Sequence, residues 1–250
     1  MMTEGLGIHI QNLHKSFKKR EVIHDLSLDI AAGSFVSLVG PSGCGKSTLL
    51  RLIAGLENPT NGEVSLSPPG KNISGFVFQE ANLLPWRNVF ENVALPFELR
   101  PEFQSLPEKD KKLRVLAALK KVQLEGSENL FPHELSGGMK MRVSLARAVV
   151  HTPRLLLMDE PFAALDENTR FEMQNQLLDL WKKEKMTIVF VTHSLFEAVY
   201  LSERIIMLKG PDARIVIDEK VDLPFERTED LRTSEKLNQL VRGVSARLRA

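Results

Sequence analysis

The chain has 250 residues, of which 43% are hydrophobic and 26% are charged, as is ordinary for a globular protein with a sizeable core. Its 33 Lys and Arg residues nearly balance its 32 Asp and Glu residues, so the net charge of +1 lacks the basic excess of a nucleic-acid-binding surface. The single cysteine, Cys44, excludes an internal disulfide and agrees with a reducing compartment.

No apolar run reaches the roughly 20 residues that a helix needs to cross a bilayer. The N-terminus has neither the basic start nor the apolar stretch of a secretory signal peptide. If the protein serves a membrane, we therefore expect a separate chain to span it.

Short apolar strands and turns are predicted in the first part of the chain. Residues 7–40 have the pattern of β-structure, with apolar and polar side chains alternating near its middle. A glycine-rich turn and a helix over residues 47–54 follow, and residues 73–78 form a further strand. From residue 83 to about 150, apolar side chains recur at spacings of three and four, which indicates helices.

The β pattern returns after residue 150. Residues 155–158 and 187–192 are predicted strands, with a helix between them that carries Met173, Leu177 and Leu180. Strands that alternate with helices favour a mostly parallel sheet covered on both faces, interrupted here by the helical insert. The last predicted elements are strands near residues 205–208 and 214–218 and a helix with an apolar stripe of Leu237, Val241, Val244 and Leu248.

A phosphate-binding loop is predicted between an apolar strand and a helix, where the sequence matches G-x-x-x-x-G-K-[ST]. Glycines let the backbone direct its N–H groups at an anion, and the helix N-terminus adds partial positive charge. We expect Lys46 to contact the β and γ phosphates of ATP and Ser47 to ligate Mg²⁺. The expected contact residues are Gly40, Pro41, Ser42, Gly43, Cys44, Gly45, Lys46, Ser47 and Thr48.

A glycine-rich turn that binds nothing is the alternative for this loop, and the flanking strand and helix argue against it. Cys44 has two interpretations. It is a small residue that fits a tight loop, or it is a redox-active thiol acidified by the helix N-terminus.

Two carboxylates, Asp159 and Glu160, follow directly on the strand over residues 155–158. Adjacent strand residues point to opposite sides, so the two carboxylates can take different roles. We expect Asp159 to help hold Mg²⁺ and Glu160 to orient and deprotonate the attacking water. Such a pair alone is often a solvated turn, but it is much more specific in a chain that has a phosphate-binding loop.

His193 follows the strand over residues 187–192 and is predicted to lie at the same sheet edge as the loop and Glu160. A lone histidine is more often structural than catalytic. The five other histidines are interpreted as structural or surface residues: His9, His14, His24, His133 and His151.

The segment Leu135–Met139, LSGGM, resembles the L-S-G-G-Q signature of the nucleotide-binding subunits of ABC transporters. With the motifs above, the chain resembles that family over nearly its whole length. The resemblance implies that Gln79 senses Mg²⁺ and the transport partner, and that a D-loop ends at Asp166. It also implies that His193 contacts the γ-phosphate and that Phe17 stacks on adenine.

The resemblance implies an α/β fold: a P-loop NTPase core with a mainly parallel sheet, an antiparallel β subdomain and an inserted α-helical subdomain. We expect one ABC ATPase domain over residues 1–250. Within it, residues 1–82 and 152–225 form the nucleotide-binding core, 83–151 the helical insert with the signature, and 226–250 a C-terminal helical extension.

A head-to-tail dimer is implied as well, in which each ATP lies between the P-loop of one chain and the signature of the other. The residues agree, because Ser136, Gly137 and Gly138 at a helix start form a second anion site. Met139 departs from the family's glutamine, and a thioether cannot replace the hydrogen bonds of an amide. The backbone donors remain, so we expect the dimer to survive and Met139 to serve core packing.

The segments 80–87 and 159–166 resemble the nitrate, sulfonate and taurine importer branch. This implies a peripheral subunit on the cytoplasmic face of the cell membrane, bound to integral permease subunits and served indirectly by a solute-binding protein. Trp86, with Leu84 and Phe90, suits an apolar groove for a permease helix. Alternatively, Trp86 is part of the core of the helical insert.

Three other functions stay open: a soluble ABC ATPase acting on nucleic acid or ribosomes, the motor of a lipid or small-molecule exporter, and a non-hydrolysing regulator. The first class usually adds a coiled coil, a zinc module or a second P-loop, none of which is visible here, so we expect no nucleic-acid partner. Glu160 and His193 argue against the regulator. The solute is not determined, since the binding protein and the permease select it.

Overall fold

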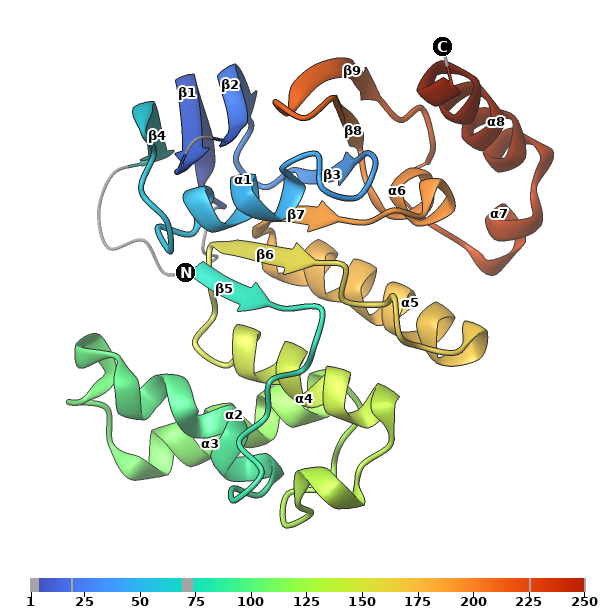
Figure 1. Cartoon of the computed structure of the whole chain (residues 1–250). Helices are drawn as coiled ribbons and strands as arrows, with labels where there is room; N and C mark the ends of the chain where they lie inside the picture. The colour runs from blue at the N-terminus through green and yellow to red at the C-terminus, as the bar shows by residue number, and fades with distance from the viewer. Residues whose placement is uncertain (1–4, 19, 69–73, 225, 250) are drawn as a thin grey trace.

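The computed structural model describes residues 5–18, 20–68, 74–224 and 226–249 (Figure 1). One of its sheets has three antiparallel strands in the order β2-β1-β4. These strands are β1 (Gly7–Phe17), β2 (Arg20–Ile30) and β4 (Asn61–Ser67). β4 is not among the predicted strands, because its apolar alternation consists only of Val64 and Leu66, both half-buried.

The second sheet has six strands in the order β5-β6-β7-β3-β8-β9. Five of its strands are parallel, and β9 pairs antiparallel with β8. The strands β3, β6 and β7 are buried along their whole length, as expected of a parallel sheet covered on both faces. Their bounds are β3 (Phe35–Val39), β5 (Ser74–Val77), β6 (Leu155–Asp159), β7 (Thr187–Val191), β8 (Arg204–Lys209) and β9 (Arg214–Lys220).

Alternate side chains of the parallel strands enter two separate cores. Leu155 and Leu157 pack with α1 (Lys46–Ile53) and the antiparallel sheet, whereas Leu156 and Met158 face the helices of the other side. Those helices include α5 (Glu167–Glu184) and α6 (Leu195–Leu201). The short α6 is not among the predicted helices.

The helical insert forms a layer of its own below the parallel sheet (Figure 1). It contains α2 (Val89–Leu99), η1 (Pro101–Phe103), α3 (Glu108–Lys121), η2 (Pro132–Glu134) and α4 (Gly137–Val149). The prediction of a helix from residue 83 is wrong for its first turns. Residues 83–88 are irregular, and Asn88 begins α2 with a capping box to Glu91.

The chain ends in α7 (Glu229–Thr233) and α8 (Glu235–Arg249), and α8 packs on α6 through the buried Leu237 and Val244. The side chain of Leu248, predicted for the same stripe, lies outside the described part. So does Ile73, the predicted first residue of β5. Across the described residues, no helix combines the length and apolar character that a bilayer span requires.

Candidate active site

Three neighbouring strand ends form the centre of the site. β3, β7 and β6 lie side by side and run parallel, so their carboxyl ends meet at one sheet edge (Figure 1). β3 leads into the loop that begins at Gly40, β6 ends at Asp159, and β7 is followed by Thr192. β7 therefore ends one residue before the predicted strand over 187–192. Thr192 lies in the loop that follows, where its hydroxyl is hydrogen-bonded.

The loop before α1 has the backbone of an anion cradle. Gly40, Gly43 and Gly45 have φ of 148°, 78° and 100°, which are positive values that residues with a Cβ atom rarely adopt. A Cβ on Gly40 would lie 2.2 Å from the carbonyl oxygen of Leu208, whereas a Cβ on Gly43 would meet nothing within 4 Å. Glycine is thus required at position 40 for space and at position 43 for conformation. This shape fits the close approach of a phosphate.

Lys46 is buried at the first position of α1. Its Nζ donates to the carbonyl oxygens of Gly40 and Pro41 at 2.8 and 2.9 Å, so the ammonium lies against the loop itself. Cys44 is only 3% exposed and packs in the core beneath the loop. Its burial favours the packing interpretation of this residue over the redox one.

The hydroxyl of Ser47 donates to Oδ1 of Asp159 at 2.9 Å. Asp159 is buried, and burial raises the pKa of its carboxyl, while the Ser47 hydrogen bond lowers it and the nearby charge of Glu160 raises it. A hard divalent cation beside these two oxygens would offset the cost of burying the carboxylate. The pair therefore fits Mg²⁺.

Glu160 and His193 face each other across the site, with Oε2 and Nδ1 3.1 Å apart. Glu160 has a φ of 46°, a strained conformation for a residue with a side chain, and its amide donates to Val191 O at 3.0 Å. A hollow of about 30 Å³ lies beside Glu160, Thr192 and His193. Because one water molecule needs about 10–15 Å³, a water can stand next to this carboxylate.

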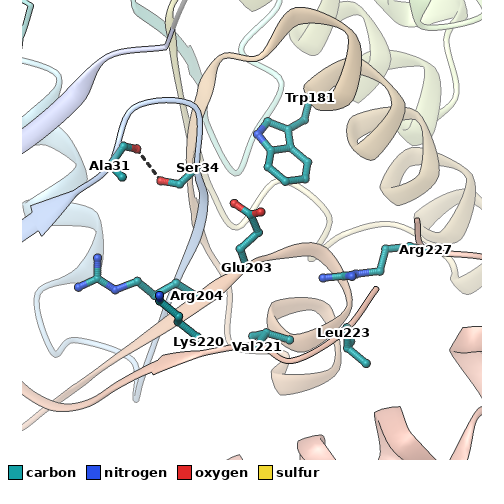
Figure 2. A pocket seen from close by; sticks show the side chains of 9 residues that line it. All are labelled: Ala31, Ser34, Trp181, Glu203, Arg204, Lys220, Val221, Leu223 and Arg227. Atoms are coloured by element: carbon teal, nitrogen blue, oxygen red, sulfur yellow. Dashed lines mark hydrogen bonds between the residues drawn. The ribbon is translucent and has the colours of Figure 1, made fainter. Parts of the chain in front are cut away.

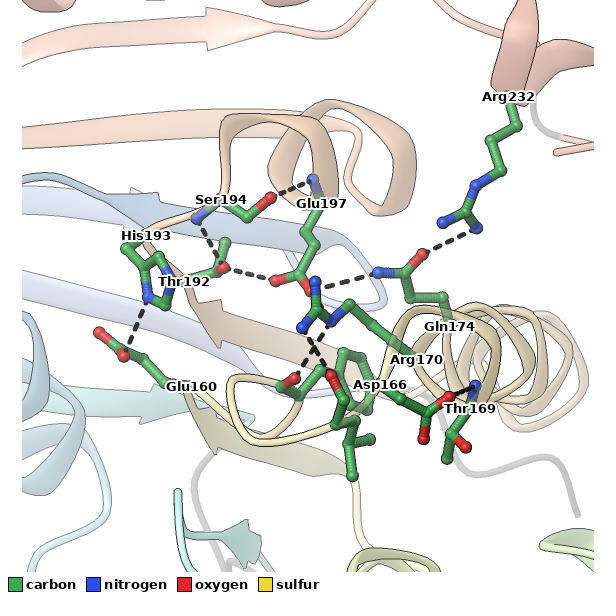
Figure 3. Close-up of polar contacts among 12 residues, drawn as sticks. Glu160, Asp166, Thr169, Arg170, Gln174, Thr192, His193, Ser194, Glu197 and Arg232 are labelled. Carbon is green, nitrogen blue, oxygen red and sulfur yellow. Dashed lines mark hydrogen bonds and ion pairs between the residues drawn. The ribbon is translucent and has the colours of Figure 1, made fainter. Parts of the chain in front are cut away.

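The buried carboxylate of Glu197, on α6, contacts the loop that follows β7 and carries Thr192 and His193 (Figure 3). It accepts hydrogen bonds from Thr192 Oγ1 at 2.5 Å and from Gln174 Nε2 at 3.2 Å, and it lies 3.8 Å from Arg170 Nε. Arg170 also donates to the carbonyl of Leu165 at 2.7 Å. Sequence reasoning missed this network, because nothing near Glu197 in the sequence marks its partners on α5 and the strand ends.

The C-terminal segment reaches the same network. Arg232 donates to Gln174 Oε1 at 3.3 Å, and its guanidinium lies 4.1 Å from the centroid of the Phe171 ring.

Asp166 caps the start of α5 and accepts a hydrogen bond from Thr169 N at 3.0 Å. That backbone hydrogen bond is the main reason why the pKa of Asp166 is lowered.

Two further predicted contacts lie at the rim. Gln79 is exposed and follows β5, which neighbours β6, so it stands at the same carboxyl edge as Asp159. Phe17 ends β1 with 44% of its surface exposed, and Lys15 Nζ lies 4.7 Å from its ring centroid.

The signature segment begins α4 in the helical insert, on the opposite side of the parallel sheet from α1 and its P-loop (Figure 1). Ser136 caps α4 by accepting a hydrogen bond from Met139 N at 3.2 Å, and a Cβ on Gly138 would clash with Thr169 of α5 at 2.5 Å. A Cβ on Gly137 would meet nothing within 4 Å, so this glycine faces open space. Met139 is partly buried and packs against the core that contains Leu156 and Met158, as expected.

Trp86 is 71% exposed, so its alternative assignment to the core of the helical insert is wrong. Leu84 is half-buried, and Phe90 packs against the same core as Met139. Trp86 thus stands out from the insert shortly after Gln79 in the chain.

A larger cavity of about 460 Å³ lies at the opposite sheet edge (Figure 2). Its lining includes Ser34, just before β3, and Glu203, just before β8. Arg227 in the same wall donates to the carbonyl oxygens of Tyr200 and Ser202 at 2.9 and 3.2 Å. This cavity is separate from the phosphate-binding loop.

Known proteins resemble the chain in sequence and in structure. Residues 23–163 match the family model described as ABC transporter. The aliphatic sulfonates import ATP-binding protein SsuB 1 of Shouchella clausii is 40% identical over 247 residues, covering 98% of this chain and 95% of that protein. The aliphatic sulfonates import ATP-binding protein SsuB 3 of Pseudomonas savastanoi pv. phaseolicola is 43% identical over 253 residues, covering 100% and 88%.

A solved dimeric ATP-binding cassette, in a post-hydrolysis state with ADP and phosphate bound, matches with a TM-score of 0.76 at 34% identity. The match covers 87% of this chain and 100% of that one. The predicted fold class and family resemblance are thereby confirmed: the chain belongs to the ABC transporter family.

Proposed function

We propose that the chain is the ATP-hydrolysing subunit of an importer and powers the uptake of an aliphatic sulfonate or a similar small solute such as taurine or nitrate. One observation carries the ATPase assignment: Lys46, the Ser47–Asp159 pair and the Glu160–His193 pair all stand at one edge of the sheet. The names of the sulfonate-import relatives support the substrate class.

In this proposal, the loop amides and Lys46 bind the phosphates of ATP, and Ser47, Gln79 and Asp159 hold Mg²⁺. Mg²⁺, when bound there, neutralises charge that develops on the phosphates. Glu160 accepts the proton of the attacking water, and His193 orients Glu160 and donates to the γ-phosphate. Phe17 covers the adenine ring.

A second copy of the chain completes the site. Its Ser136, Gly137 and Gly138 supply backbone donors at a helix start, and Asp166 of the D-loop lies at the interface between the copies. The open space around Gly137 supports this arrangement, as does the dimeric state of the solved cassette.

We further propose that the chain binds integral permease subunits peripherally, at the cytoplasmic face of the cell membrane, and depends indirectly on a solute-binding protein. The exposed Trp86 supports a docking surface for an apolar permease helix.

Lys46→Ala is the decisive variant. We expect it to abolish tight ATP binding and turnover in a phosphate-release assay, and to abolish solute uptake in vesicles that contain the permease. Lys109→Ala, at an exposed position of α3, is the matched control. Intact nucleotide affinity and turnover in Lys46→Ala would contradict the ATPase assignment. An active ATPase that drives no uptake of sulfonate, taurine or nitrate would contradict only the substrate assignment.

A further inference from the structure

Three metal-ligating side chains gather on the hairpin formed by β1 and β2. Glu21 Oε1 lies 3.2 Å from His14 Nδ1, and Glu21 Oε2 lies 3.1 Å from His24 Nδ1. The ligand atoms of all three residues lie within 4.8 Å of one another. The two imidazole rings meet edge to face with their centroids 5.0 Å apart, so both surround the same carboxylate.

Irregular pairing creates this arrangement. The register of β1 against β2 shifts between Leu13 and Lys15, beside His14, and again between Lys15 and Ser16, where Val22 is an extra residue in β2. A regular strand would turn residues three apart to opposite faces, whereas such shifts re-aim side chains locally. Together the two shifts account for Glu21 and His24 standing on one side of the hairpin beside His14.

The spacing of these atoms is close to that of a metal site. Zinc bonds to imidazole nitrogen and carboxylate oxygen are about 2.0–2.2 Å long, so two ligand atoms of a tetrahedral ion lie about 3.4 Å apart. Both contacts of Glu21 are within a few tenths of an ångström of that separation. An ion requires side-chain shifts that bring ligand atoms now within 4.8 Å of one another to about 3.4 Å, with each imidazole carrying its proton on Nε2 instead of Nδ1.

The site is accessible to solvent. The side chains of His14, Glu21 and His24 are 25%, 42% and 49% exposed, so an ion can reach them and keep a water as fourth ligand.

We propose that His14, Glu21 and His24 form a binding site for a divalent transition-metal ion of the zinc class, distinct from the Mg²⁺ site at the sheet edge. The set of two imidazoles and one carboxylate, with a fourth position open to water, suits Zn²⁺ and, among related ions, Co²⁺ and Ni²⁺. Bound metal would tie β1 to β2 beside the end of β1 that carries Phe17.

The test uses the nucleotide-free full chain without a polyhistidine tag. Zn²⁺ binding is measured by competition with a chromophoric chelator, and Co²⁺ binding by its visible absorption. The variants are His14→Gln, Glu21→Gln and His24→Gln. The control is His9→Gln, which removes a histidine of the same sheet that pairs with a single carboxylate, Asp29, at 2.7 Å.

We expect the wild-type chain and His9→Gln to bind one Zn²⁺ with equal affinity, and each of the three site variants to lose about tenfold or more. Tetrahedral Co²⁺ absorption should appear in the first two proteins only. The melting temperature checks that each variant is folded, and adding Zn²⁺ should raise it only in the proteins that bind. Equal Zn²⁺ affinity in the wild type and in the double variant that combines His14→Gln with His24→Gln would overturn the proposal.

Discussion

The Ser47 hydroxyl and the Asp159 carboxylate touch at 2.9 Å although they are 112 positions apart in the chain. They meet because β3 and β6 end at the same sheet edge, with only β7 between them. Their two oxygens give a hard cation two ligands of the type that it prefers.

Removing the Ser47 hydroxyl or the charge of Asp159 should weaken Mg²⁺ binding. We expect Ser47→Ala and Asp159→Asn to raise the Mg²⁺ concentration needed for half-maximal ATP turnover by about tenfold or more, since mutation of even an outer partner in a metal site costs about 10–100-fold in metal affinity. Ser34→Ala, at the opposite end of β3, is the control and should leave the Mg²⁺ titration unchanged. If the Mg²⁺ dependence of turnover were unchanged in both site variants, the assignment of this pair as Mg²⁺ ligands would be wrong.

Glu160→Gln should separate ATP binding from hydrolysis. The amide keeps the shape of the side chain but cannot accept the proton of water, so turnover should fall about 10²–10⁴-fold while ATP affinity stays within a few-fold. With saturating ATP the variant should dimerise, as seen by light scattering. Glu167→Gln, in the first turn of α5, is the control. Near-normal turnover of Glu160→Gln would refute the assignment, and a persistent monomer would count against the dimer.

Glu197 acts through Thr192, so it is a positioning residue. Glu197→Ala should leave Thr192 and Gln174 without their buried acceptor and lower kcat about tenfold or more, with little change in the KM for ATP. Glu197→Gln retains one carbonyl oxygen, which can accept from Gln174, and its amide can donate to the Thr192 hydroxyl, so it should restore part of kcat. If the two variants were equally slow, the hydrogen bonds would not be the cause.

Trp86→Ala should weaken capture of the permease. An exposed tryptophan that anchors an interface contributes about 2 kcal/mol or more, which corresponds to about a thirtyfold loss of affinity. The control is Leu99→Ala, at the end of α2, where the side chain is 69% exposed. Copurification from detergent measures the loss. Equal retention of both variants would place the docking surface elsewhere.

His151 should make the fold sensitive to mild acid. Burial, with the nearby charge of Arg100, lowers its pKa from 6.5 to about 4. Above pH 6.5 the folded and unfolded states are both neutral here, whereas between pH 6.5 and 4 only the unfolded state gains the proton. The free energy of unfolding should therefore fall by up to about 3 kcal/mol over that interval.

Urea unfolding across this pH range measures the effect. His151→Leu should flatten the slope, while His9→Gln, at an exposed position, should keep it. A His151→Leu slope as steep as that of the wild type would assign the acid sensitivity to other groups.

Contiguous motifs were readable from the sequence alone. The loop from Gly40 to Thr48, the carboxylates after β6 and the LSGGM segment each encode their backbone geometry in adjacent residues, so their place in the fold followed from the elements that flank them. The hydrophobic pattern of buried parallel strands determined the α/β class in the same way, because each strand needs apolar cover on both faces.

Pairings between distant elements were decided only by the tertiary structure. The sequence does not show that Glu197 sits behind Thr192, or that Glu21 stands between His14 and His24, because a carboxylate can meet any cation or donor that packing brings near. Nor does apolar character distinguish an exposed Trp86 from a core residue. Burial depends on which neighbouring surfaces are present, and those come from segments far away in the chain.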